Sequence, residues 1–170
     1  MDTDETEREN RALAGRLIEA CRRAGVRLAT AESCTGGLIG ATLTAVAGAS
    51  DVFQGGVISY QNGVKEMLLG VSPETLARVG AVSADCARQM ALGARRALGA
   101  GIAVSATGIA GPGGATPGKP VGLVYVGVAW GEGLAEAFEN HFAGDRDAVR
   151  AQTVRKALES ALACLEKVRE

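Results

Sequence analysis

Apolar side chains recur every three to four residues in several stretches of the chain, and this spacing is typical of amphipathic helices. In residues 6–24 it is carried by Leu13, Leu17 and Cys21, and Gly25 suits the position just after the helix end. Similar patterns predict helices over residues 36–45, 62–69 and 83–98, a turn or short helix from Pro73, and a long final helix capped by Asp145.

Short aliphatic runs between these segments have the length and composition of buried strands. They span residues 27–31, 53–60, 102–107, 121–130 and 134–142. The last two flank a Gly-Glu-Gly connection that suits a hairpin, whereas the early strands alternate with helices. The pattern predicts one α/β domain over residues 1–170, a three-layer sandwich with a mixed sheet of about five strands and helices on both faces.

Composition narrows the class of protein. The 170 residues carry a net charge of −1, and 47% are apolar but only 4% aromatic. A near-neutral chain lacks the basic footprint of a nucleic-acid-binding protein, and no run of like charge suggests a membrane surface. The polar amino terminus does not resemble a signal peptide, and no apolar stretch reaches the roughly 18 residues of a membrane span. We therefore expect a cytoplasmic protein without nucleic-acid or membrane partners.

The four cysteines are far apart and form no CxxC pair, so a disulfide framework is not expected. No cluster of His, Cys or Asp has the spacing of metal ligands. The sequence gives no reason to expect a metal ion or an organic cofactor.

Three unusual segments follow predicted strands. They are residues 32–37 (ESCTGG), 59–65 (SYQNGVK) and 107–114 (TGIAGPGG). In open α/β sheets, ligands bind beyond the carboxyl ends of the strands. If the early strands are parallel, all three segments meet at one edge of the sheet, and this edge is the candidate site.

The first segment places Ser33 at a strand-to-helix turn that is rich in glycine. Backbone N–H groups at a helix start lack intrahelical partners and can hold an oxyanion or a phosphate. A hydroxyl beside such donors is what acyl transfer requires. The alternative is that Ser33 or Thr35 only caps the helix, and the residues of this segment leave both interpretations open.

A serine nucleophile needs a base. The chain has one histidine, His141, in the second strand of the hairpin, where a structural role is commoner. Of four lysines, Lys65 lies just after a strand and beside an apolar run, where partial burial would lower its pKa and leave a neutral base. Tyr60 could relay a proton. The alternatives are an exposed helix lysine and a core aromatic residue at the strand end.

The third segment contains glycines that allow close backbone approach to a ligand. Residues 113–119 have the GxxxxGK spacing of a phosphate-binding loop, but Pro120 replaces the Ser or Thr, and a strand follows instead of a helix. A P-loop is therefore excluded. Lys119 is expected to lie in a mobile loop.

Arg146 stands in the first turn of the final helix, where a cation opposes the helix dipole. Such a residue could instead grip an anionic group. Pairing with Asp145 or Asp147 is an equally open alternative.

Four segments together resemble the CinA C-terminal domain family. They are AESCTGG at residues 31–37, SYQNGVKEMLLGV at 59–71, SATGIAGPGG at 105–114, and FAGDRDAVR at 142–150. The resemblance covers residues 10–165. It implies nicotinamide-nucleotide amidohydrolase activity, in which nicotinamide mononucleotide is hydrolysed to nicotinate mononucleotide and ammonia. Larger members carry a further N-terminal domain, so this chain is similar to the stand-alone form, and family behaviour suggests a homodimer.

The resemblance also implies roles for individual residues. Ser33 is the expected nucleophile, with Lys65 and Tyr60 as acid–base partners and Arg146 as a candidate for the 5′-phosphate. The oxyanion would be held by N–H groups in the first segment or in the turn at Gly108. A non-catalytic nucleotide-binding or regulatory module is the alternative. The expected substrate-binding residues are Cys34, Thr35, Gly36, Thr107, Gly108, Gly111, Gly113, Gly114 and Arg146.

Overall fold

A five-stranded mixed sheet organises the protein. The structure is a computed structural model that describes residues 3–168. The strand order is β2-β1-β3-β4-β5, with β1 parallel to both β2 and β3, and with β4 antiparallel to both β3 and β5. The strands span β1 (Leu28–Glu32), β2 (Phe53–Ile58), β3 (Ile102–Gly108), β4 (Leu123–Trp130) and β5 (Leu134–His141).

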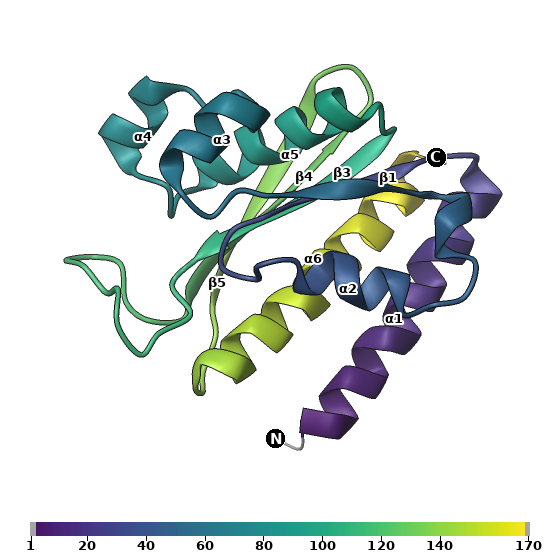
Figure 1. Ribbon diagram of the computed structural model, residues 1–170, viewed down its shortest axis with the longest axis horizontal. Helices are drawn as coiled ribbons and strands as arrows, with labels where there is room; N and C mark the ends of the chain where they lie inside the picture. The colour runs from purple at the N-terminus through teal and green to yellow at the C-terminus, as the bar shows by residue number, and fades with distance from the viewer. Residues whose placement is uncertain (1–2, 169–170) are drawn as a thin grey trace.

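Helices cover both faces of this sheet (Figure 1). One face carries α1 (Thr3–Ala24), α2 (Leu38–Thr44) and α6 (Arg146–Val168), and the other carries α3 (Asn62–Leu69), α4 (Pro73–Val79) and α5 (Ala84–Leu98). A short 3-10 helix, Ala49–Asp51, precedes β2. The predicted α/β sandwich with a mixed five-stranded sheet is confirmed. No helix in residues 3–168 is both long and apolar enough to cross a membrane.

The central strand β1 is buried on both faces, as a strand between two helical layers should be. Leu28 packs with the core under α1 and α6, whereas Ala29 and Ala31 pack with the core under α5. Because side chains alternate along a strand, Glu32 points to the α2 side, and the next residue, Ser33, points to the α3 side.

Two of the predicted boundaries that differ from the structure lie next to the candidate site. The strand β2 ends at Ile58, so Tyr60 lies in the following loop. The helix α2 begins at Leu38, two residues later than predicted, because Gly36 and Gly37 have positive φ values of 57° and 102°, outside the helical region. Pro73 does open a helix, α4, whose first turn is capped by the side chain of Ser72.

Candidate active site

The three loops that follow β1, β2 and β3 lie at one edge of the sheet, because these strands are parallel. The sheet hydrogen bonds continue into the loops. The Ser33 N–H donates to Ala106 O at 2.9 Å, and the Ser59 N–H donates to Glu32 O at 2.8 Å. The predicted convergence of the three segments is therefore present in the fold.

Ser33 and Lys65 are in direct contact at this edge. Lys65 Nζ lies 3.1 Å from Ser33 Oγ, although the two residues are 32 positions apart. Lys65 is 1% exposed and Ser33 is 9% exposed. Lys65 sits in the first turn of α3 and reaches back along the preceding loop, where its Nζ also donates to Ser59 O at 2.7 Å and Tyr60 O at 3.1 Å.

Burial lowers the pKa of Lys65 below its ordinary value, because desolvation disfavours the ammonium form. The ionisable groups that act on it are the thiols of Cys34 and Cys86, and burial raises the pKa of each thiol to about 11. Among the described residues, no carboxylate forms an ion pair with Lys65. In its neutral form, the amine would keep its two N–H groups on the carbonyls of Ser59 and Tyr60 and direct its lone pair at the Ser33 hydroxyl.

Glu32 anchors the start of α2 to the end of β1. It is 2% exposed, and its carboxylate accepts from the N–H groups of Ile39 at 2.8 Å and Gly40 at 3.0 Å. These N–H groups are therefore not free to bind an oxyanion or phosphate, which corrects the expectation drawn from the helix start. A lone carboxylate at the end of a buried strand, just before a glycine-rich turn, was a sequence signal for this anchor.

Glu32→Gln is expected to lower the free energy of unfolding by about 1–3 kcal/mol, because an NH₂ group replaces one of the two acceptors and one buried N–H loses its partner. Urea denaturation measures the loss. The matched control is Glu66→Gln on the exposed face of α3. Equal stability of the two variants would contradict an anchoring role for the Glu32 carboxylate.

The turn that carries Ser33 contains two backbone N–H groups without an oxygen acceptor among the described residues. The Gly36 N–H donates to Ser33 O at 3.1 Å, which closes the turn. Within residues 3–168, no oxygen atom accepts from the N–H groups of Cys34 or Thr35, and the Cys34 N–H faces only its own thiol, a weak acceptor. Of the expected oxyanion donors, Gly36 is thus already occupied. The Cys34 N–H has no oxygen acceptor in this part of the chain and belongs to a residue that is 7% exposed, whereas Thr35 is 0% exposed and its N–H is out of reach of a ligand.

Tyr60 and Arg146 meet at the mouth of the site. The Tyr60 side chain is exposed, and its hydroxyl lies 3.4 Å from Arg146 Nη2, so only its backbone carbonyl contacts Lys65. An acid–base role for the phenol requires it to swing from Arg146 toward Ser33, and that role stays a prediction. Arg146 Nη1 also donates to Gly111 O at 2.8 Å. Arg146 thus bridges two loops rather than pairing with Asp145 or Asp147.

The 107–114 segment contributes mainly its backbone. The Thr107 hydroxyl is buried and donates to Ala81 O at 2.9 Å. A Cβ added at Gly108 would lie 2.6 Å from Val124 on β4. A Cβ added at Gly111 would lie 2.5 Å from Val121 at the end of the loop. Packing therefore explains these two glycines without a ligand.

The rest of this loop is exposed. Gly113 and Gly114 lie in its outer part, and nothing within 4 Å would meet a Cβ at Gly113. Lys119 was expected in a mobile loop. Its Nζ instead donates to Val79 O, and this hydrogen bond ties the loop to the end of α4.

Arg150 is a site residue that the sequence alone did not reveal. One turn after Arg146 on α6, its Nη2 donates to Thr35 O at 3.0 Å. The spacing of two arginines four residues apart, which places both on one helix face, was the available signal.

His141 lies away from Ser33. It ends β5, the edge strand three positions from β1, which corresponds to roughly 14 Å across the sheet. Its ring is exposed and bonded to Glu139 at 2.8 Å. The Ser-His arrangement is therefore disfavoured.

His141→Ala is expected to change the free energy of unfolding by less than about 0.5 kcal/mol, as surface substitutions usually do, and to leave any hydrolysis of a carboxamide close to the wild-type rate. Steady-state kinetics with a carboxamide substrate check this. Loss of activity in a folded variant would instead make histidine the base.

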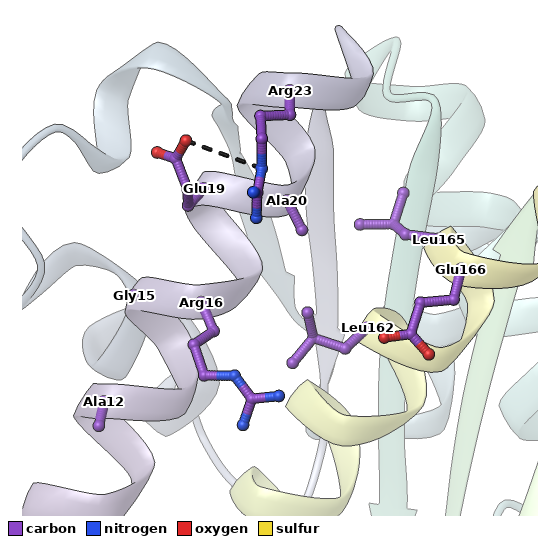
Figure 2. Close-up of a pocket in the computed structure, with 9 residues that line it drawn as sticks. All are labelled: Ala12, Gly15, Arg16, Glu19, Ala20, Arg23, Leu162, Leu165 and Glu166. Carbon is purple, nitrogen blue, oxygen red and sulfur yellow. Dashed lines mark ion pairs between the residues drawn. The ribbon is translucent and has the colours of Figure 1, made fainter. Parts of the chain in front are cut away.

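The surface hollow shown in Figure 2 lies between α1 and α6, with a volume of about 470 Å³. Helix α1 supplies Arg16 and Arg23, the latter paired with Glu19 at 3.8 Å, and α6 supplies Leu162 and Leu165. None of its lining residues comes from the three loops of the site. In residues 3–168, no group of three or more His, Cys, Asp or Glu side chains is placed to hold a metal ion.

Comparison with known proteins gives consistent results. The sequence model of the CinA C-terminal domain matches residues 10–165. A CinA-like protein of Rippkaea orientalis is 50% identical over 139 residues, which are 82% of this chain and 33% of that protein. One from Cyanothece sp. is 59% identical over 119 residues, 70% of this chain and 28% of that protein. The chain spans about a third of the length of the curated relatives it matches.

Two solved structures are similar over nearly their whole length. The competence/damage inducible protein CihA of Agrobacterium tumefaciens has a TM-score of 0.88 and 44% identity, covering 92% of this chain and 95% of that chain. A CinA superfamily protein of Klebsiella pneumoniae has a TM-score of 0.89 and 37% identity, covering 93% of this chain and 98% of that chain.

Proposed function

Because this chain belongs to the CinA C-terminal domain family, we propose that it hydrolyses the carboxamide of nicotinamide mononucleotide, giving nicotinate mononucleotide and ammonia. The observation that carries the proposal is the buried contact of 3.1 Å between Lys65 Nζ and Ser33 Oγ. A buried lysine with a lowered pKa and no paired carboxylate among the described residues is suited to take a proton from a serine.

In the first step Lys65 Nζ accepts the Ser33 hydroxyl proton while Ser33 Oγ bonds to the carboxamide carbon. The carbonyl π electrons move to the oxygen, which becomes an oxyanion. The N–H group of Cys34 is the proposed donor to this oxygen.

In the second step the tetrahedral intermediate collapses and the C–N bond breaks. The Lys65 ammonium returns its proton to the departing nitrogen, which leaves as ammonia. Water then attacks the acyl-enzyme and gives a proton to Lys65. Lys65 passes this proton to Ser33 Oγ as the acyl–oxygen bond breaks, and nicotinate mononucleotide is released. Tyr60 is a second candidate for delivering the proton to ammonia.

Arg146 is the proposed ligand for the 5′-phosphate. Its guanidinium already lies between the Tyr60 hydroxyl and Gly111 O, and it is exposed at the mouth of the loops. Guanidinium groups bind phosphate with two parallel hydrogen bonds. This assignment makes the phosphate a determinant of affinity and leaves the chemistry to Ser33 and Lys65.

The test is release of ammonia and nicotinate mononucleotide from nicotinamide mononucleotide by the purified protein. The matching nucleoside, which lacks the phosphate, serves as the comparison and should be a poorer substrate through a higher KM. If neither compound yields ammonia, the proposal is wrong. Binding of the nucleotide without turnover would instead favour a non-catalytic nucleotide-binding module.

A further inference from the structure

We infer that Arg150 is a positioning residue that strengthens the Cys34 N–H as a hydrogen-bond donor, acting through two peptide groups of the Ser33 turn. This inference rests on the proposed function, because the acceptor is the oxyanion of the amide hydrolysis. Arg150 itself touches no reacting atom in this scheme.

The path runs through two successive hydrogen bonds. Arg150 Nη2 donates to Thr35 O at 3.0 Å. The carbonyl of Thr35 belongs to the same peptide group as the Gly36 N–H, which donates to Ser33 O at 3.1 Å. The Ser33 carbonyl in turn shares its peptide group with the Cys34 N–H, which has no oxygen acceptor within residues 3–168.

Each bond along this path polarises the next one in the same direction. A cation at a carbonyl oxygen draws electron density from the attached N–H, so that N–H becomes a stronger donor. Cooperative strengthening of this kind is about 10–30% per bond. The path therefore lets the charge of Arg150 polarise the Cys34 N–H, which lies beside Ser33.

The charge of Arg150 is available for this purpose. Its nearest acid is Asp147 at 3.8 Å, whose side chain is 79% exposed, so the pair is weak. The guanidinium lies against the turn, since Nη2 would be the nearest atom to a Cβ at Gly36, at 3.9 Å. Gly36 also has a φ of +57°, a conformation that disfavours a side chain there.

The test compares Arg150→Gln and Arg150→Lys with Arg155→Gln. Arg155 is on the same helix and pairs with Glu9, so its variant matches the change in charge without touching the turn. Arg150→Gln is expected to lower kcat roughly tenfold with little change in KM. The loss stays below the 10²–10³ typical of a deleted oxyanion donor, because the donor remains. Arg150→Lys should recover part of the loss.

An aldehyde analogue of the nucleotide provides a second readout. Ser33 Oγ adds to its aldehyde carbon, the hydroxyl proton passes to Lys65, and the carbonyl oxygen becomes the oxyanion. In Arg150→Gln the inhibition constant should rise by the same factor as kcat/KM falls. If Arg150 had only a structural role, its loss would lower thermal stability, and the change in the inhibition constant would not match the change in kcat/KM.

A third readout does not depend on turnover. In Arg150→Gln, the amide resonances of Gly36 and Cys34 should move upfield in ¹⁵N–¹H spectra, and in Arg155→Gln they should not move. If the wild type releases no ammonia, the proposed function fails. The amide resonances still test whether Arg150 polarises the Cys34 N–H. Unchanged resonances, an unchanged kcat, or a rise in KM that accounts for the whole loss would each overturn the inference.

Discussion

Ser33→Ala is expected to reduce ammonia release from nicotinamide mononucleotide by about 10⁴- to 10⁶-fold, the range found when a nucleophile and its base act as a unit. Without Oγ no acyl-enzyme can form, and Lys65 has no hydroxyl to deprotonate. The loss should appear in kcat, because Arg146 and the glycine-rich loop are untouched. Single-turnover ammonia assays at high enzyme concentration can measure a loss this large.

Ser160→Ala is the matched control for this change. Ser160 is also buried, and its Oγ lacks a hydrogen-bond partner in the described part of the chain, but it lies on α6. This variant should retain full activity. Activity in Ser33→Ala within tenfold of wild type would exclude Ser33 as the nucleophile.

Lys65→Met is expected to lower kcat by about 10²- to 10⁴-fold, the usual contribution of general acid–base catalysis. Methionine matches the length and the burial of the side chain but cannot accept a proton. Nucleotide binding should persist, because the amine contacts only Ser33 and two backbone carbonyls. Calorimetric titration with the nucleotide separates this loss of chemistry from a loss of the site.

The same variant gives a prediction about stability and pH. Burial lowers the pKa of Lys65 in the folded chain below its ordinary value of 10.5, so just below that value the unfolded chain holds a proton that the folded chain lacks. Unfolding then takes up a proton, and stability rises with pH. Wild type should therefore gain stability relative to Lys65→Met as pH rises from the folded-state pKa toward 10.5. A constant difference across this window would mean that the pKa of Lys65 is not lowered.

The periodicity of apolar residues was sufficient to predict the layers of the fold. Each α-helix and strand corresponds to a segment predicted from spacing and turn residues, whereas the short 3-10 helix Ala49–Asp51 was not predicted. The hairpin of β4 and β5 follows from its glycines. The contact of Ser33 with Lys65 was also predictable in outline. Two parallel strands bring their following loops together, and an apolar run around Lys65 signals burial.

Other features of the site have no local signal in the sequence. The carbonyls of Ser59 and Tyr60 hold Lys65, and backbone groups look the same at every position. The direction of the Tyr60 phenol depends on Arg146, a residue 86 positions away. The start of α2 shifted because two glycines with positive φ extend the turn, and glycine alone does not reveal the sign of its φ.

The tie between Arg150 and Thr35 spans 115 positions of the chain. At 5–20 residues per second, a ribosome needs roughly 6–23 s to synthesise that stretch. Ser33, its turn and Lys65 are thus made well before the side chain that braces the turn. A growing chain therefore holds an unbraced Ser33 until α6 has emerged and docked. If Arg150 acts as inferred, the proposed hydrolysis would reach its full rate only after α6 has docked against the turn.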